Sequence, residues 1–254
     1  MQIRHCLVGG VLIVAAIFVL LVGSMDAANT HRYLIGGVLI AAGVIVLLSE
    51  SKWRRQFVDI KARKPSGRTG RRLYRDPKGH YRSFELLLDK LHLIPGESLL
   101  DICCGGGGLL ERALSTAGHA AGLDHSPDMV SLTQENNAQA FAENRLDVRQ
   151  GDAGALPWDV ATFDAVANAN ALFFLPDPVQ VFREAYRLLK PSGRFAVVTT
   201  AKRKLVSIAF GPWRSSMALY TDDQLADMLI KAGFVQVEAY SPDGMHQIGY
   251  GVKG

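Results

Sequence analysis

The stretch SLLDICCGGGG, residues 98–108, runs directly into LLERAL, residues 109–114. The apolar residues from Leu99 to Ile102 predict a buried strand, the four glycines predict a tight turn, and the apolar residues after them predict a helix. Strand, glycine turn and helix in this order are typical of nucleotide-binding α/β units. We therefore expect an α/β domain whose ligand site lies at this turn.

Strand and helix patterns alternate on both sides of this unit. A helix is predicted from about Gly79 to just before Pro95, after an irregular segment. A Thr221–Gln224 capping box opens the last helix, and Gly233 is predicted to end it. Further strands are predicted to end at Asp124, Asp152, Asn168 and Thr200, further helices to open at Ser126-Pro127 and Asp177-Pro178, and VQVEAY (235–240) and residues 248–252 to form a terminal antiparallel pair. This pattern predicts four or five parallel strands joined by crossover helices.

The glycine turn does not identify its ligand, because dinucleotide, nucleoside and phosphate sites all use such a turn. A dinucleotide site needs a third glycine in G-x-G-x-x-G, but the sixth position is Leu110 counted from Gly105 and Glu111 counted from Gly106. No Lys-Ser or Lys-Thr pair follows the glycines, which argues against a P-loop. Cys-His, Ser-His-Asp and metal-spaced clusters are absent from the sequence, so we predict no metal site and disfavour a hydrolase.

Three carboxylates are predicted at the carboxyl ends of successive strands: Asp101, Asp124 and Asp152. Ligands of open α/β sheets bind at that edge. Asp124 follows Asp101 by twenty-three residues, close to the spacing at which an acidic side chain accepts both hydroxyls of a ribose. This spacing favours a ligand that carries a ribose without a 2′-phosphate.

From about Lys64 to its C-terminus, the chain resembles the class I S-adenosylmethionine-dependent methyltransferases. It is most similar to the small-molecule, type 11 branch that includes quinone-biosynthesis enzymes. The matching motifs are LLDICCGGGG (99–108), GLDHSPDM (122–129), GDAGALPW (151–158), FDAVANANALFFLPD (163–177) and LKPSGRF (189–195). The resemblance implies a Rossmann-like, mostly parallel seven-stranded sheet with an antiparallel C-terminal strand. It also implies S-adenosyl-L-methionine as methyl donor. Two uncharged runs near the N-terminus and the apolar segment 202–220 favour a small, quinone-like or lipid acceptor that can partition into a membrane.

Carried over motif by motif, the resemblance implies a donor site on the glycine turn. Gly105 and Gly107 are implied to let the backbone approach the methionine part of the donor, and Asp101 to order its ammonium group. Asp124 is implied to hold the ribose. Cys103 stands where the family has its first loop glycine, so a side chain is expected to narrow the pocket there.

The same resemblance assigns the rest of the site. His125 and Met129 are implied beside the adenine, and Asp152 and Ala153 at its amino edge. Asn168 is implied to face the methyl group and the acceptor, and is therefore predicted as catalytic as well as donor-binding.

His80 is the second predicted catalytic residue. It belongs to KPSGRTGRRLYRDPKGHY (64–81), which resembles a segment that precedes the first motif in many methyltransferases and places a Gly-His near the donor. An alternative is a histidine that only caps a helix. If the acceptor is an enol, a phenol or a carbon acid, a base such as His80 helps the transfer, whereas a thiolate or free amine needs little help.

Two uncharged runs precede this part of the chain, at about 6–25 and 33–49. Both approach the length of a membrane span, and GGVLIVAA (9–16) recurs as GGVLIAAG (36–43). We predict a transmembrane helical hairpin over residues 1–50. A cleaved signal peptide and a buried core helix remain alternatives for the first run.

Charge is concentrated between the hairpin and the domain. Residues 51–82, predicted as a juxtamembrane neck, hold twelve Lys or Arg against two acidic residues, whereas the whole chain is only +4. The remainder, 83–254, is predicted as the methyltransferase domain and is acidic, so nucleic acid is not an expected partner. The positive-inside rule predicts a two-span membrane protein with its soluble domain and both termini in the cytoplasm. Membrane lipid is an expected partner through the hairpin and the neck, with simple topological signalling as the alternative.

A second class of function stays open: a non-catalytic, membrane-bound assembly or interaction module that keeps the same fold. Cys103 in the glycine turn and the lack of an obvious base motivate it. The segment KRKLVSIAFGPWRSSMALY (202–220) is expected to cover the acceptor, to lie on a membrane surface, or simply to pack on the core. The three cysteines predict no disulfide framework, and the oligomeric state is not predicted.

Overall fold

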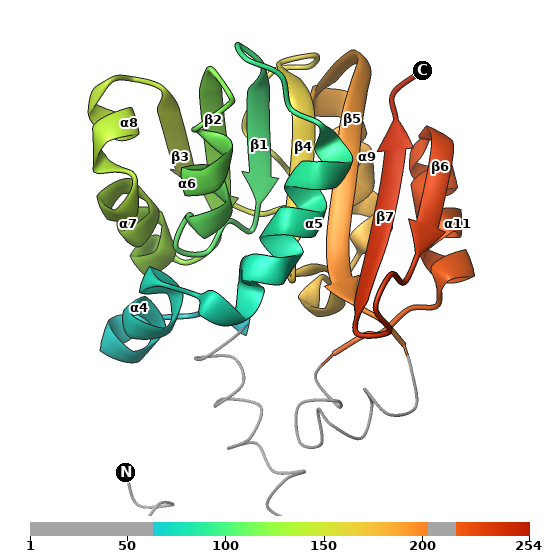
Figure 1. Cartoon of the computed structure of the whole chain (residues 1–254), viewed down its shortest axis with the longest axis horizontal. Helices are drawn as coiled ribbons and strands as arrows, with labels where there is room; N and C mark the ends of the chain where they lie inside the picture. Colours follow the sequence, from blue (N-terminus) through green and yellow to red (C-terminus); the bar gives the residue numbers. More distant parts are fainter. Residues whose placement is uncertain (1–62, 203–216) are drawn as a thin grey trace, which may run out of the picture. The chain divides into compact units, whose positions relative to one another are not determined.

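A computed structural model of the chain describes residues 63–202 and 217–254, which fall within one compact unit, Gln56–Gly254. Its centre is a seven-stranded sheet of order β3-β2-β1-β4-β5-β7-β6 (Figure 1). The strands are β1 Ser98–Ile102, β2 His119–Asp124, β3 Leu146–Gln150, β4 Phe163–Ala169, β5 Leu189–Thr200, β6 Val235–Tyr240 and β7 His246–Val252. β1 to β5 are parallel, and β7 runs antiparallel to both β5 and β6. The Rossmann-like, mostly parallel sheet with its antiparallel C-terminal strand is therefore confirmed.

Helices cover both faces of the sheet, with α5 crossing in front of the central strands and α9 behind them (Figure 1). The described α-helices are α4 Gly67–Arg75, α5 Tyr81–Leu91, α6 Gly108–Ala113, α7 Pro127–Asn136, α8 Ala138–Ala142, α9 Pro178–Leu188 and α11 Asp222–Ala232, and the short 3-10 turns are η2 Lys78–His80 and η3 Leu172–Phe174. Successive residues of a strand pack against the helices on opposite faces of the sheet, since Leu99 packs with α5 and Leu100 packs with α9. A buried strand between two helical layers explains why the first motif is a continuous apolar run.

The core is built from fully buried aliphatic and aromatic side chains. Leu87 and Leu91 of α5 have no exposed surface, and neither has Phe182 of α9. Burying a side chain of this size stabilises a fold by about 2 kcal/mol. The apolar layers therefore fix the strand ends, where the polar residues of the site lie.

The helix caps agree in part with the sequence. The Thr221–Gln224 capping box is confirmed at α11, and Gly233 ends that helix in a left-handed conformation. Asp177 caps α9 by accepting a hydrogen bond from the Gln180 amide. The Ser126 hydroxyl does not cap α7; it donates to the Pro65 carbonyl instead.

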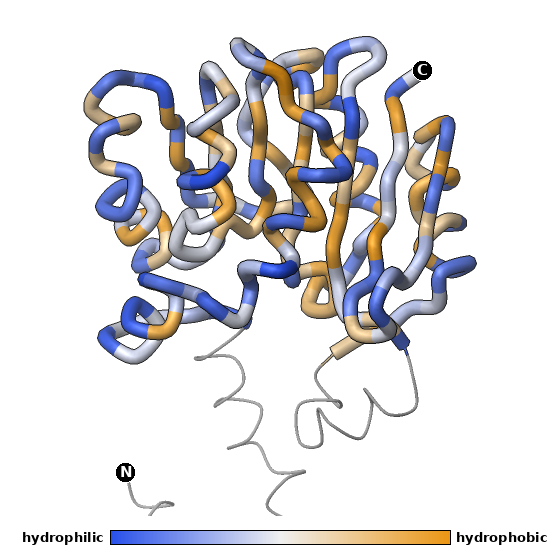
Figure 2. Tube along the Cα trace, viewed as in Figure 1, coloured by the Kyte–Doolittle hydropathy of each residue, from blue (hydrophilic) through white to orange (hydrophobic). Residues whose placement is uncertain are grey.

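The prediction of an irregular segment up to about Gly79 is wrong, because α4 and η2 lie there. α4 is a mostly hydrophilic helix (Figure 2), and its sequence has little apolar periodicity. Contacts with α7 hold it: the Gly67 amide donates to Asp128 at 2.7 Å, and Arg71 donates to Glu135 at 2.6 Å. Glu135 also pairs with Arg75. Tertiary contacts with residues about sixty positions away thus decide this helix.

The predicted membrane localisation is corrected by the helices of the described part. Among residues 63–202 and 217–254, no helix has both the length and the apolar character that a membrane span needs. The predicted placement as a two-span membrane protein with cytoplasmic termini is therefore corrected to what this finding supports, which is no membrane span among the described residues. The two runs named as spans, 6–25 and 33–49, lie outside the described residues, as do most of the neck before Arg63 and most of the 202–220 segment.

Candidate functional site

A cleft of about 640 Å³ opens at the carboxyl ends of β1, β2 and β4. Three segments far apart in sequence meet around it: the glycine turn, the α4–η2 region and the loops that follow β3 and β4. In Figure 1, α4 lies at the same edge of the sheet as the β1 arrowhead. Of the predicted site residues, those that line the cleft are His80, Asp101, Cys103, Gly105, Asp124, His125, Asp152 and Ala153.

Asp101 is a buried carboxylate without a partner for one of its oxygens. It is only 2% exposed, and its Oδ1 accepts no hydrogen bond. Burial, and then the charge of Asp124, hold the pKa of the Asp101 carboxyl well above its usual range. A buried, unsatisfied carboxylate oxygen in a cleft is costly unless a ligand cation or donor reaches it. The Asp101 oxygen therefore fits an ammonium or sulfonium group.

Asp124 joins the glycine turn to the end of β2. Its Oδ2 accepts the Gly105 amide at 3.0 Å, and its Oδ1 accepts the Ser126 amide at 2.9 Å. Burial raises the pKa of the Asp124 carboxyl, although these two amides partly oppose the shift. The side chain is thus held in one orientation at the wall of the cleft, where its remaining lone pairs can accept hydroxyl donors.

The glycine turn is shaped by three residues in the left-handed region. Cys103, Gly105 and Gly107 have φ angles of 63°, 55° and 79°. Glycine adopts this conformation freely, whereas the Cβ of Cys103 makes it strained. Cys103 lies at the cleft, as expected for a side chain that narrows it. Gly107 does not line the cleft; it packs on α7, where an added Cβ would lie 2.7 Å from Thr133.

Tyr74 of α4 is a cleft residue that the motifs did not identify. An added Cβ on Gly105 would lie 2.9 Å from the Tyr74 ring, and one on Gly106 would lie 2.1 Å from the Tyr74 carbonyl oxygen. Burial, followed by the charge of Asp124, raises the pKa of the Tyr74 phenol to about 12. The available signal was an aromatic residue in a charged segment six positions before His80.

His80 lies between two aromatic rings at the cleft. Its ring centroid is 6.0 Å from that of Tyr74 and 6.1 Å from that of Phe84, both edge-on. Burial lowers the pKa of the His80 imidazole below its usual 6.5. At neutral pH the ring is therefore uncharged and able to accept a proton.

Asn168 and Asn170 differ in where their side chains lie. Asn168 is fully buried inside β4, and its amide donates to the Ile102 carbonyl at 2.8 Å, at the end of β1. It does not line the cleft, whereas Asn170 does. Asn170 has φ 55° and its amide donates to the Ser83 hydroxyl of α5 at 2.9 Å. β4 continues to Ala169, so the first polar residue free of the strand ladder is two positions later than the motif suggested.

Of the residues predicted beside the adenine, three line the cleft and one does not. His125, Asp152 and Ala153 line one end of the cleft, beyond Asp124. Met129 is fully buried in α7 and does not line it. Asp152 is exposed and accepts the Gly154 amide at 2.8 Å. The strand order explains the grouping, because the ends of β3 and β2 are neighbours.

The other end of the cleft is largely apolar. Phe84 of α5 and Pro77 face it from one side. Phe174, Leu175 and Pro176, which follow β4, line it from another. Tyr220, the last residue of the 202–220 segment, packs against the core and is not among the cleft residues. One end of the cleft thus offers carboxylates and the other offers aromatic and aliphatic surface.

Comparison with known proteins agrees with this geometry. The family model described as a methyltransferase domain matches residues 100–197. A demethylmenaquinone methyltransferase of Lactobacillus johnsonii is 33% identical over 134 residues, covering 52% of this chain and 54% of that protein. A demethylmenaquinone methyltransferase of Shouchella clausii is 31% identical over 177 residues, covering 59% of this chain and 75% of that protein. The chain spans about half the length of the first curated relatives that it matches.

A solved structure with the same fold is the geranyl diphosphate C-methyltransferase of Streptomyces coelicolor, determined with geranyl diphosphate and S-adenosyl-L-homocysteine. The two share 16% identity and a TM-score of 0.59, over 68% of this chain and 77% of that one. At this identity the likeness concerns the fold alone. The sheet order, the glycine turn with its carboxylates, and the sequence match to the Shouchella clausii protein agree. The chain belongs to the class I S-adenosylmethionine-dependent methyltransferase family.

Proposed function

We propose that this protein transfers a methyl group from S-adenosyl-L-methionine to a small quinone-like acceptor bound in the same cleft. The observation that carries the proposal is the unpartnered, buried Oδ1 of Asp101 beside the glycine turn. A buried carboxyl oxygen without a partner is expected to persist where it has a function to perform. The α-ammonium and the sulfonium of the donor carry the matching positive charge.

The residues of the cleft fit this donor part by part. Asp101 is proposed to hold the ammonium group, and the bare backbone of Gly105 to lie against the methionine portion. Asp124, fixed by two amides, is proposed to accept the ribose hydroxyls. His125, Asp152 and Ala153 are proposed to surround the base. Cys103 is proposed to contact the donor from the start of the turn.

The apolar end of the cleft is proposed to hold the acceptor. Phe174 and Leu175 are half-buried there, the exposed Pro176 adjoins them, and the buried ring of Phe84 closes the wall behind. Such a lining suits a planar apolar ring better than a charged or sugar-like molecule. The two relatives described above are both demethylmenaquinone methyltransferases, which supports a quinone-like acceptor for this chain.

When bound, S-adenosyl-L-methionine supplies a methyl group that is already activated on a sulfonium. The work left to the protein is to align the acceptor with that methyl group and to exclude water. His80 is proposed to accept the proton that an acceptor hydroxyl releases as its ring carbon displaces the sulfonium sulfur from the methyl group, because burial keeps the imidazole uncharged. The hydrogen left on that ring carbon then moves to the acceptor oxygen, which restores the aromatic ring. Asn170 is proposed to fix α5, and with it His80, at the mouth of the cleft through its bond to Ser83.

The test is methyl transfer by the full chain. The protein is incubated with isotope-labelled donor and a reduced, unmethylated naphthoquinone, and the product is identified by mass spectrometry. A product one methyl group heavier is expected, and it should disappear in Asp124→Asn but persist in Asp223→Asn, an exposed carboxylate of α11. Donor binding without product across quinone, phenol and lipid acceptors would contradict the proposal and favour the non-catalytic module.

A further inference from the structure

The loop between β3 and β4 forms one end of the cleft without any regular secondary structure of its own. It runs from Gly151 to Thr162, and Gly151, Asp152 and Ala153 line the cleft. Because β3 adjoins β2 in the sheet, this loop bounds the space just beyond Asp124. A loop of this length needs external contacts to hold one conformation.

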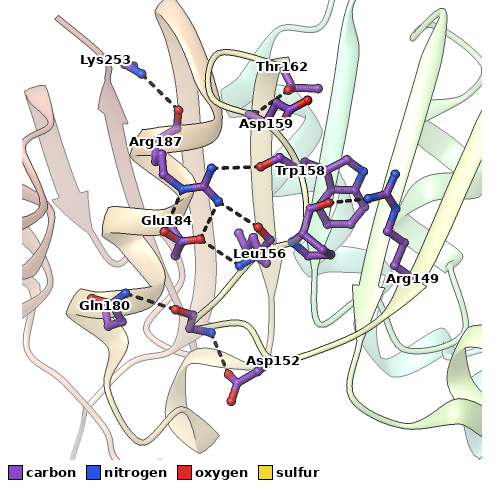
Figure 3. A network of polar contacts seen from close by, with 12 residues as sticks. Arg149, Asp152, Leu156, Trp158, Asp159, Thr162, Gln180, Glu184, Arg187 and Lys253 are labelled. Carbon is purple, nitrogen blue, oxygen red and sulfur yellow. Dashed lines mark hydrogen bonds and ion pairs between the residues drawn. The ribbon is translucent and has the colours of Figure 1, made fainter.

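Arg187 of α9 provides most of these contacts (Figure 3). Its Nη2 donates to the Leu156 carbonyl at 2.8 Å, and its Nη1 donates to the Trp158 carbonyl at 2.9 Å. The Arg187 carbonyl accepts the amide of Ala161 at 3.2 Å. A single residue of α9 thus contacts the loop at three points along its length.

Glu184, one turn earlier on α9, completes the contact. It accepts two hydrogen bonds from Arg187, at 2.9 and 2.7 Å, and it also accepts the Leu156 amide at 2.9 Å. Leu156 therefore has both its amide and its carbonyl bound to this pair. Gln180, one turn before Glu184 on α9, donates to the Gly154 carbonyl at 3.1 Å. Gly154 directly follows the cleft residue Ala153.

The charges of the pair are stable over the physiological range. The hydrogen bond to Arg187 lowers the pKa of the Glu184 carboxyl, and the hydrogen bond to Glu184 raises the pKa of the Arg187 guanidinium. Neither residue lines the cleft. The guanidinium fork satisfies two carbonyls and one carboxylate together, which a lysine amine cannot do with the same geometry.

We infer that Glu184 and Arg187 are positioning residues that set the selectivity of this cleft for the base of its nucleoside ligand. The inference rests on the proposed function and adds the residues that determine base recognition. They act through the Gly151–Thr162 loop, whose first residues line the cleft beside Asp124. Weakening the Glu184–Arg187 contact is therefore expected to reduce the difference in affinity between ligands with different bases, while the carboxylates of β1 and β2 stay in place.

The test compares the full-length wild type with Arg187→Lys and Glu184→Gln. Calorimetry gives the affinities for S-adenosyl-L-homocysteine and for S-inosyl-L-homocysteine, which differ only at the base edge. In both variants, binding of the adenosyl ligand is expected to weaken about tenfold, the effect of one lost hydrogen bond, whereas the inosyl ligand should change about twofold or less by the same reasoning. The selectivity ratio should fall accordingly.

Hydrogen exchange of the unliganded protein gives a readout that needs no ligand. The amides of the 153–162 segment, Leu156 above all, are expected to exchange faster in both variants than in the wild type. The matched control is the surface pair Glu143 and Arg145, whose side chains are 3.0 Å apart. Neither residue lines the cleft. Glu143→Gln and Arg145→Lys should change neither selectivity nor loop exchange.

The outcomes separate the inference from the proposed function. If the wild type binds S-adenosyl-L-homocysteine but both variants keep its selectivity, or weaken both ligands equally, the inference is overturned and the proposed function stands. If the wild type binds neither ligand, the proposed function fails and the inference with it, whatever the loop exchange shows. Should Arg187→Lys not fold, as its melting curve would reveal, Glu184→Gln alone decides the comparison.

Discussion

The backbone amide of Gly105 donates a hydrogen bond to Oδ2 of Asp124 at 3.0 Å. This bond joins the turn after β1 to the last residue of β2, nineteen positions along the chain. The Ser126 amide binds the other carboxylate oxygen. The carboxylate that is proposed to bind the ribose therefore also holds the turn on which the donor is proposed to lie.

Asp124→Asn is expected to weaken both the fold and donor binding. Its single amide oxygen can accept only one of the two backbone amides, and its NH₂ group would face the other, which costs about 1–3 kcal/mol. Thermal unfolding measures the first effect, and calorimetry with S-adenosyl-L-methionine should show a loss of about a hundredfold in affinity, or about 3 kcal/mol. Unchanged affinity in a folded variant would contradict a role for Asp124 in the donor site.

Asp101→Asn is expected to stabilise the unliganded protein while weakening donor binding. Because burial raises the Asp101 pKa, the folded protein binds more protons than the unfolded chain between the ordinary and the raised pKa, so its stability falls as pH rises through that window. The asparagine removes that loss and is expected to add about 2 kcal/mol at neutral pH. Denaturant unfolding at two pH values checks the sign. Equal stability of the two proteins at neutral pH would show that folding does not raise the pKa of Asp101.

His80→Gln is expected to reduce kcat about a hundredfold with little change in the KM for the donor. Since burial lowers the pKa of His80 below 6.5, the wild-type rate should fall as pH drops through that lowered value, where the imidazole becomes protonated. In the variant, kcat should not show this fall at low pH. A pH profile of kcat for both proteins makes the comparison, and the same fall in the variant would assign the proton transfer to another group.

The Ser83–Asn170 pair is expected to be coupled energetically. Each side chain is bonded to the other, at 2.9 and 3.2 Å, and Ser83 is only 1% exposed. Ser83→Ala leaves the Asn170 amide short of a partner and should cost about 1–2 kcal/mol. In a double-mutant cycle with Asn170→Ala, thermal unfolding should show a coupling of about 1 kcal/mol. Additive effects would mean that the contact does not fix α5.

Gly106→Ala is expected to displace α4 from the glycine turn. The new Cβ would lie 2.1 Å from the Tyr74 carbonyl oxygen, a backbone atom that can move only with the helix. Hydrogen exchange should show loss of protection across α4 and η2, with the sheet still protected. Gly79→Ala is the control, because no heavy atom lies within 4 Å of its added Cβ. Equal protection of α4 in both variants would contradict the close approach.

Local sequence patterns predicted most of the architecture. The apolar run with four glycines, the capping box at Thr221 and the terminal strand pair are each contained within a few residues, and all appear in the structure. The cleft position of Asp101 and Asp124 also followed from chain order, because parallel strands bring their carboxyl ends to one edge. Periodicity, turn chemistry and capping are short-range effects, so a single sequence displays them.

Residues distant in sequence decided the rest. The Ser83–Asn170 contact spans 87 positions, and the bond from Ser126 to Pro65 spans 61. Tyr74, Asn170 and the Glu184–Arg187 pair belong to the site or its support only because helices pack against strand ends that lie elsewhere in the chain. The sequence by itself therefore determined the family, the sheet and the carboxylates of the cleft. The tertiary structure decided which aromatic, amide and arginine side chains surround them, because only long-range packing fixes those positions.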